Sequence, residues 1–168
     1  MGNRDFKVSV TKLLSHPGEP LEVELAGLIG DQFVSSAWVE EGSTTHLSGS
    51  LEAVHSGVMF SGVAKVNIVT ECRRCLCHSK ADLVVEIREL FESDYKEDEG
   101  DTYPIHGEFV DLEEMVRDAV VLALPPAPLC KEECAGLCVT CGVDKNLVSC
   151  GHDNQGRDPR FSILDQLR

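Results

Sequence analysis

The sequence Val58-Met-Phe-Ser-Gly-Val-Ala-Lys-Val-Asn-Ile68 carries apolar residues at alternating positions, and a similar alternation returns in Leu83-Val-Val-Glu-Ile87. A period of two places the apolar side chains on one face of a β-strand. The two runs therefore predict consecutive strands that each turn one face toward a core. Between them lies Cys72-Arg-Arg-Cys75, which this pattern places at the end of a strand.

Short apolar runs separated by Gly, Ser and Asn precede this pair and predict further strands. They cover residues 6–11, 21–25, 33–39 and 47–54. Runs of this length are typical of an antiparallel sheet or a small barrel. Residues 92–107 are polar and acidic and contain Gly100 and Pro104, so we expect a surface loop there.

An amphipathic helix is predicted over residues 111–124. Its apolar stripe, at helical spacing, consists of Leu112, Met115, Val116, Ala119, Val120 and Ala123. Asp111 and Glu114 predict a capped start, and Pro125 and Pro126 predict the end. A second, short helix is expected after Asp158-Pro159, with Phe161, Leu164 and Leu167 as its packing face.

These elements indicate an α+β protein with an N-terminal antiparallel sheet or small barrel and one amphipathic helix. Because the C-terminal segment holds five of the eight cysteines, at the close spacings of zinc ligands, we expect it to be zinc-stapled and to end in a short helix. We expect a β-rich domain over residues 1–128 and a cysteine-rich, zinc-binding segment over residues 129–168. The chain has 168 residues, which is the usual size of one domain with a small appended module.

The chain has eight cysteines but no sign of export. No run approaches the ~18–20 apolar residues of a membrane span, and residues 1–7 are charged with no apolar run behind them. We therefore expect a cytoplasmic protein without a membrane partner. Because cytosolic thiols are kept reduced, metal binding explains the cysteines better than disulfides do.

The cysteines form close pairs of the kind that bind zinc. The candidate ligands are Cys72, Cys75, Cys130, Cys134, Cys138, Cys141, Cys150 and His152. Tetrahedral zinc takes four such ligands, so four pairs predict two zinc ions, and at least one. We expect Cys138, Cys141, Cys150 and His152 to form a local site and the other four to tie the sheet to the C-terminal segment. Cys77 is left as a free thiol.

Other interpretations of the cysteines stay open. Some pairs would be ordinary buried thiols, since cysteine is often buried. Four cysteines could instead bind an iron–sulfur cluster. The two arginines between Cys72 and Cys75 would lower thiol pKa values, which suggests a redox enzyme or sensor. Thioredoxin-like motifs begin a helix, however, whereas here one strand follows another, and no other catalytic motif is present. We therefore expect a protein that is not an enzyme.

The net charge of −14 is concentrated in residues 86–118, which hold 13 acidic and 3 basic residues. Phosphate binding normally requires basic patches, so this segment disfavours direct RNA contact. A basic protein partner fits the acidic segment better, although a merely solubilising loop would look the same. An RNA-binding zinc ribbon would require exposed basic residues around it. The available ones are only Lys131, Lys145, Arg157 and Arg160.

Several motifs occur in an order that resembles the YceD family of large ribosomal RNA subunit accumulation proteins. They are Glu71-Cys-Arg-Arg-Cys-Leu76, Asp111-Leu-Glu-Glu-Met115, Leu122-Ala-Leu-Pro-Pro-Ala-Pro-Leu-Cys130, Gly136-Leu-Cys-Val-Thr-Cys-Gly142 and Asp158-Pro-Arg160. The resemblance runs from about Glu71 to the C-terminus. One departure is Cys150-Gly-His152, where members with the full cluster end in Cys-x-Cys; imidazole is an acceptable substitute.

The resemblance implies a non-enzymatic factor needed for accumulation of 23S ribosomal RNA. Together with the charge pattern it predicts a zinc-stabilised interaction protein of ribosome biogenesis that meets a ribosomal protein or a large-subunit assembly intermediate. The direct partner and any contact with RNA stay open. A redox function of Cys72 and Cys75 is the alternative.

Overall fold

The computed structural model describes residues 4–16, 18–95 and 102–152. Its central feature is a hairpin of two long antiparallel strands, β6 (Gly57–Glu71) and β7 (His78–Glu92), paired along their whole length from Gly57↔Glu92 to Glu71↔His78. The buried apolar side chains of β6 are those of the predicted alternation, from Val58 to Ile68, and Thr70 continues the buried face. The hairpin turn holds Cys72 and Cys75, at the strand end where the sequence placed them.

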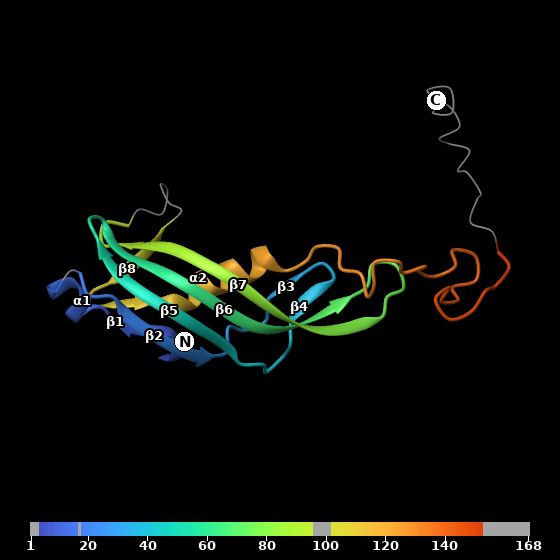
Figure 1. The fold of residues 1–168 in the computed structure, drawn as a ribbon, viewed down its shortest axis with the longest axis horizontal. Coiled ribbons are helices and arrows are strands. Elements are labelled where there is room, and N and C mark those ends of the chain that lie inside the picture. Colours follow the sequence, from blue (N-terminus) through green and yellow to red (C-terminus); the bar gives the residue numbers. More distant parts are fainter. Residues whose placement is uncertain (1–3, 17, 96–101, 153–168) are drawn as a thin grey trace, which may run out of the picture.

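The other edge of β6 pairs with two strands in succession. β5 (Thr45–Val54) covers its first part and β4 (Ala37–Val39) its last part. β2 (Leu21–Gly27) continues the sheet beyond β5, and β3 (Phe33–Val34) beyond β4. Thus β6 pairs with two different strands along one edge. The sheet that contains them is curled, as Figure 1 shows.

The strands that follow β7 complete the sheet and make it mixed. β8 (Tyr103–His106) runs parallel to the end of β7, then pairs antiparallel with β9 (Phe109–Asp111), which pairs with β1 (Lys7–Ser9). The predicted antiparallel sheet is thus a curled mixed half-barrel. The surface loop expected over residues 92–107 is wrong in part, because β8 lies within it; residues 96–101 lie outside the described part.

Two of the predicted strands are divided in the structure. Residues 33–39 form β3 and β4, separated by a turn in which Ser35 has a φ of 50°. Residues 6–11 contain β1, followed by the short helix α1 (Thr11–Ser15) and preceded by the 3-10 turn η1 (Arg4–Phe6). Elements of two to five residues are too short to show a period in the sequence. The apolar alternation therefore predicted one continuous strand in each of these two regions.

A pair of facing glycines lets two central strands approach closely. Gly49 in β5 lies opposite Gly62 in β6. A Cβ atom on Gly49 would lie 2.4 Å from the carbonyl oxygen of Ser61, and one on Gly62 would lie 2.3 Å from that of Ser48. Only glycine fits such an approach of two backbones, and glycines of this kind mark bends in sheets.

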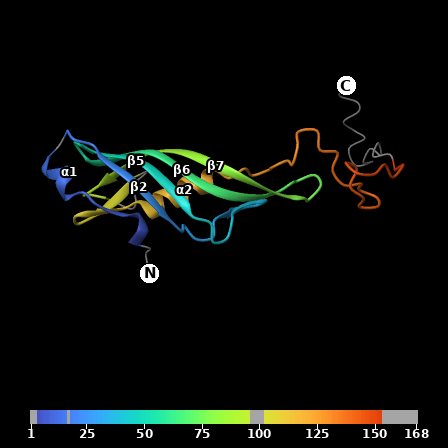
Figure 2. The same ribbon diagram turned by 60° about the horizontal axis from the view of Figure 1, so that its bottom comes forward.

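The helix α2 (Leu112–Ala123) packs against the core face of the sheet, beside β7 and β1 (Figures 1 and 2). Asp111 caps its start by accepting a hydrogen bond from the Glu113 N–H at 3.1 Å. Its buried residues, Leu112, Met115, Val116 and Val120, lie on the predicted stripe. They join Phe6, Phe60 and Phe91 in one core. The helix ends before Pro125, as predicted; the helix expected after Asp158 lies outside the described residues.

Within the described part of the chain, no helix is both long and apolar enough to cross a membrane. The remaining described residues, 125–152, extend away from the half-barrel at the end where the β6–β7 hairpin turns (Figure 1). They contain turns and one isolated bridge between Leu137 and Asp144. This arrangement brings Cys130 and Cys134 next to Cys72 and Cys75 of the hairpin turn.

Candidate metal sites

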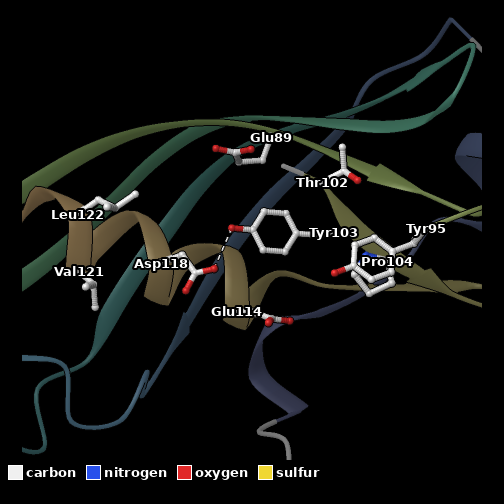
Figure 3. Close-up of a pocket in the computed structure, with 9 residues that line it drawn as sticks. All are labelled: Glu89, Tyr95, Thr102, Tyr103, Pro104, Glu114, Asp118, Val121 and Leu122. Atoms are coloured by element: carbon white, nitrogen blue, oxygen red, sulfur yellow. Dashed lines mark hydrogen bonds between the residues drawn. The ribbon is translucent and has the colours of Figure 1, made fainter. Parts of the chain in front are cut away.

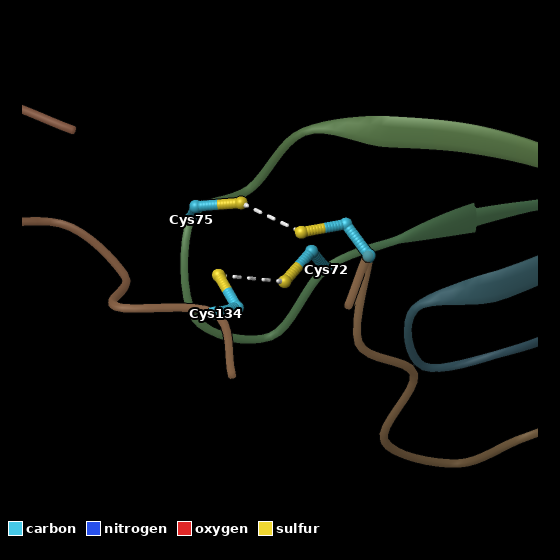
Figure 4. A group of neighbouring side chains, drawn as sticks. Cys72, Cys75 and Cys134 are labelled. Atoms are coloured by element: carbon cyan, nitrogen blue, oxygen red, sulfur yellow. Dashed lines mark hydrogen bonds between the residues drawn. The ribbon is translucent and has the colours of Figure 1, made fainter. Parts of the chain in front are cut away.

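Four cysteines meet at the turn of the long hairpin, and we call them the proximal cluster: Cys72, Cys75, Cys130 and Cys134. Their four sulfur atoms all lie within 4.8 Å of one another. The Sγ of Cys72 is 3.8 Å from that of Cys134, and the Sγ of Cys75 is 3.6 Å from that of Cys130. Figure 4 shows Cys72 and Cys75 on the hairpin turn and Cys134 on the C-terminal segment that runs beside it. The sequence predicted this grouping across the fold.

Arg74, in the hairpin turn, forms hydrogen bonds to the backbone of the C-terminal segment. Its guanidinium Nη1 donates to the backbone oxygens of Cys134 at 3.0 Å and Glu132 at 3.3 Å. The neighbouring Arg73 N–H donates to the carbonyl of Pro128 at 3.0 Å. These hydrogen bonds hold the chain on both sides of Cys130 where its partner cysteines lie. Neither arginine was predicted from the sequence to have this role.

Gly136 allows the segment to pass directly beside Arg74. It has a φ of 71°, in the left-handed region that favours glycine. A Cβ atom there would lie 2.8 Å from the Arg74 carbonyl oxygen. That oxygen accepts a hydrogen bond from the Leu137 N–H at 2.9 Å. Close contact and backbone conformation thus both require glycine at this position.

The second group of ligand atoms, which we call the distal cluster, consists of Cys138, Cys141, Cys150 and His152. These atoms too lie within 4.8 Å of one another. A tight turn brings Cys141 back to Cys138, because the Gly142 N–H donates to the Cys138 carbonyl at 2.8 Å. The Nδ1 of His152 lies 3.8 Å from the Sγ of Cys138. The local grouping expected from the sequence is therefore present in space.

Each cluster contains thiols with lowered and with raised pKa values. Backbone N–H groups, foremost that of Cys130, lower the pKa of Cys72 to about 6. The N–H groups of Cys141 and Thr140 lower the pKa of Cys138 to about 6. Burial instead raises the pKa of Cys130 to about 11. Thiolates are thus favoured at Cys72 and Cys134 in the proximal cluster and at Cys138 in the distal cluster, and a metal would displace protons from the other thiols.

The donor sets fit zinc. Four sulfurs, or three sulfurs and one imidazole nitrogen, are the usual ligands of structural zinc, and such sites are closed to substrate.

Cys77 stands outside both groups of four: it is exposed, although its Sγ lies 3.2 Å from that of Cys75. In the clusters, three sulfurs are nearly inaccessible, since Cys72, Cys134 and Cys138 are 1%, 3% and 2% exposed.

Asn146 is a second residue that the sequence analysis missed. It belongs to the loop between Cys141 and Cys150, yet its side chain reaches the proximal cluster. Its Nδ2 lies 3.4 Å from the Sγ of Cys134, and its Oδ1 accepts from the Ala135 N–H at 2.9 Å. An asparagine two residues after Asp144 in a short loop is the one sequence signal, because such side chains often bond to nearby backbone groups.

A separate cleft of about 590 Å³ lies between α2 and the strands β7 and β8 (Figure 3). Its lining contains the three carboxylates Glu89, Glu114 and Asp118, and none of its described lining residues is a lysine or arginine. Tyr103 donates from its hydroxyl to Asp118 at 3.0 Å. Burial, with Asp118 adding to it, raises the pKa of Tyr103, so the phenol stays protonated. The cleft therefore offers negative charge beside aromatic rings.

Comparisons with known proteins agree with the resemblance. The family described as large ribosomal RNA subunit accumulation protein YceD matches residues 60–168. Uncharacterised proteins of Mycobacterium tuberculosis and Mycobacterium bovis are 32% identical over 169 residues, covering 95% of this chain and 80% of each relative. One from Mycobacterium leprae is 31% identical over 135 residues, covering 77% of this chain and 61% of the relative. No solved structure matches.

Proposed function

The chain belongs to the YceD family of large ribosomal RNA subunit accumulation proteins, and we propose that it is a non-enzymatic, cytoplasmic factor of large-subunit assembly that promotes accumulation of 23S ribosomal RNA. The match over residues 60–168 carries this proposal. It covers both cysteine clusters and the helix α2, so the family's shared part coincides with the sites described above.

Zinc has a structural role in this proposal. Cys72, Cys75, Cys130 and Cys134 would bind one ion, and Cys138, Cys141, Cys150 and His152 a second. Bound zinc would fix residues 129–168 against the β-rich domain of residues 1–128. The support is the approach of eight ligand atoms in two groups of four, with donor types that suit zinc and no open coordination position for catalysis.

The acidic surface would bind the partner, a basic ribosomal protein or an assembly intermediate that carries one. The cleft beside α2 supports this, because Glu114 and Asp118 line it together with the ring of Tyr103. An arginine or lysine side chain could pair with the carboxylates and lie against the ring. Phosphates would be repelled by the same carboxylates, so RNA is not the expected ligand of this cleft.

The test is co-purification of the tagged, full-length chain from cells, with identification of the bound ribosomal proteins and RNA. Large-subunit precursors should be enriched, and depletion of the chain should lower the ratio of 23S to 16S ribosomal RNA. Unchanged ribosomal RNA levels and no enrichment of ribosomal precursors would refute the proposed function.

A thiol redox function is the second candidate, and one observation favours it. The pKa of Cys72 is lowered to about 6 by backbone N–H groups, as in reactive thiols. Zinc content after anaerobic purification distinguishes the two. Two zinc ions per chain support a structural role, whereas a metal-free chain with a reversible Cys72–Cys75 disulfide supports redox chemistry.

A further inference from the structure

Hydrogen bonds within the loop between Cys141 and Cys150 hold Asn146 in one position. The Oδ1 of Asp144 accepts from the Asn146 N–H at 2.8 Å and from its Nδ2 at 2.7 Å. The Asp144 carbonyl in turn accepts from the N–H groups of Leu147 and Val148, at 3.1 and 3.0 Å. Both ends of this loop carry distal ligands, Cys141 and Cys150. The loop's conformation therefore depends on the distal cluster.

The same loop is fastened to the chain that carries the proximal cluster. The Lys145 N–H donates to the Gly136 carbonyl at 2.9 Å, and Leu137 and Asp144 form an antiparallel bridge. Asn146 completes the contact: its amide nitrogen approaches the sulfur of Cys134, and its oxygen accepts the next N–H in the chain, that of Ala135. One side chain thus touches the proximal ligand and fixes the backbone beside it.

An amide N–H directed at a sulfur favours the thiolate over the thiol and orients it. The Nδ2 of Asn146 lies 3.4 Å from the Cys134 Sγ, and water has little access to this contact, since Cys134 is 3% exposed. Loss of such an outer partner typically costs 10–100-fold in metal affinity. Order in the distal loop therefore changes the energy of a ligand in the proximal cluster.

We propose that the two clusters bind metal cooperatively, and that Asn146 is the positioning residue that couples them. This inference rests on the proposed zinc binding. Metal at the distal cluster would order the loop and hold Asn146 against Cys134, which raises the affinity of the proximal cluster. Coupling between two binding sites is reciprocal, so proximal metal would raise distal affinity by the same factor.

The test measures Zn²⁺ affinities of the full chain by competition with a chromophoric chelator. Cys141→Ser with Cys150→Ser isolates the proximal site, and Cys130→Ser isolates the distal site. The affinity for both ions in the unaltered chain, divided by the product of the two isolated affinities, gives the coupling factor. We expect a factor of about 10.

Asn146→Ala, introduced into all three backgrounds, should bring this factor to about 1. The matched control is Asn67→Ala, which removes an asparagine hydrogen bond to Asp82 on the sheet, at 2.9 Å, and should leave the factor unchanged. Hydrogen exchange in β6 and β7 verifies that each variant keeps its sheet. Thiolate-to-Co²⁺ charge-transfer absorption gives an independent measurement of loading at each isolated site.

The outcomes separate this inference from the proposed function. Two zinc ions bound with a factor near 1 in the unaltered chain would overturn the coupling and leave the structural zinc proposal standing. A factor that survives Asn146→Ala would overturn the role of Asn146. A chain that binds no zinc would overturn both the coupling and the zinc sites, while the effect of depletion on 23S ribosomal RNA would still test the assembly function.

Discussion

The half-barrel and the cysteine-rich segment bury different kinds of atoms. The sheet and α2 share a core of hydrocarbon side chains, in which Phe6, Phe60 and Phe91 are fully buried. Within described residues 125–152, the buried residues are Cys134, Gly136 and Cys138. Two large apolar side chains of this segment point to solvent, since Val139 is 84% and Leu147 is 82% exposed.

The comparison indicates how each region is stabilised. Burial of apolar surface stabilises the half-barrel, at roughly 25 cal/mol per Å². The cysteine-rich segment is too short and too exposed for that, as small modules below about 40 residues usually are, and such modules rely on metals or disulfides. We therefore expect the two regions to respond differently to the same treatment.

Removal of metal should have the largest effect and should affect one region only. A structural zinc site contributes roughly 10–16 kcal/mol of apparent binding energy, which is comparable to the stability of a whole domain. A strong chelator should abolish amide protection over residues 130–152 and leave it in β6 and β7, as measured by hydrogen exchange. Cys138→Ser should reproduce the loss around the distal cluster. Unchanged protection after complete zinc removal would contradict a structural role.

Removal of a large core side chain should have the opposite effect: it should destabilise the half-barrel and leave the distal cluster unchanged. Phe60→Ala removes a fully buried ring and should lower the free energy of unfolding of the half-barrel by about 3–5 kcal/mol. Zinc affinity of the distal cluster should hardly change, because its four ligands lie within residues 138–152. Denaturant unfolding and zinc competition measure the two effects. A parallel loss of distal affinity would show that the regions do not differ as we infer.

Gly136→Ala should weaken the junction between the regions. The new Cβ would lie 2.8 Å from the Arg74 carbonyl oxygen, in a backbone conformation that costs about 1–2 kcal/mol for a residue other than glycine. Proximal zinc affinity should fall by about 10-fold or more. Gly18→Ala, at a φ of 116° with open space around it, is a control for strain remote from the clusters. Equal proximal affinity in both variants and wild type would argue against the packing described.

Charge removal should change partner association while both regions stay folded. Glu114→Gln with Asp118→Asn removes two charges from the cleft and should slow association with large-subunit precursors, most strongly at low salt, since screening shortens from about 10 Å at 0.1 M to 3 Å at 1 M. Glu132→Gln with Glu133→Gln removes the same charge from the cysteine-rich segment. If the two variants associate at equal rates, the effect is one of net charge rather than of the cleft.

Cys77→Ser should have the smallest effect. The thiol is exposed and lies outside the four ligand atoms of the proximal cluster, despite its 3.2 Å approach to Cys75. Zinc content and proximal affinity should stay within about two-fold of the unaltered chain, because surface substitutions rarely exceed ±0.5 kcal/mol. A loss of one zinc ion would instead make Cys77 a ligand.

Regular repetition made part of this structure predictable. The alternation from Val58 to Ile68 gave the strand and its buried face, and the stripe from Leu112 to Ala123 gave the helix. The cysteine spacing gave two groups that the structure brings together. The parallel strand β8 was not predictable in this way, because only Tyr103 and Pro104 pair with β7 and two residues carry no period.

The residues that support the clusters were unpredictable for a different reason. Arg74 bonds to the backbone of Cys134, 60 positions away, and any residue type at that position would present the same carbonyl. Asn146 reaches Cys134 only because the loop folds back on Gly136. Contacts between a side chain and distant backbone leave no pattern in a single sequence.

The position of the proximal cluster along the chain also sets an order of folding during synthesis. Cys75 meets Cys130, 55 positions later, and Cys72 meets Cys134, 62 positions later. The two cysteines of the hairpin turn are therefore synthesised long before their two partners. All strands of the half-barrel and α2 precede Cys130, and domains generally fold as units from the N-terminal side as they emerge. The metal binding proposed for this cluster would therefore be a late event, and an occupied cluster would indicate that the whole half-barrel has already been synthesised.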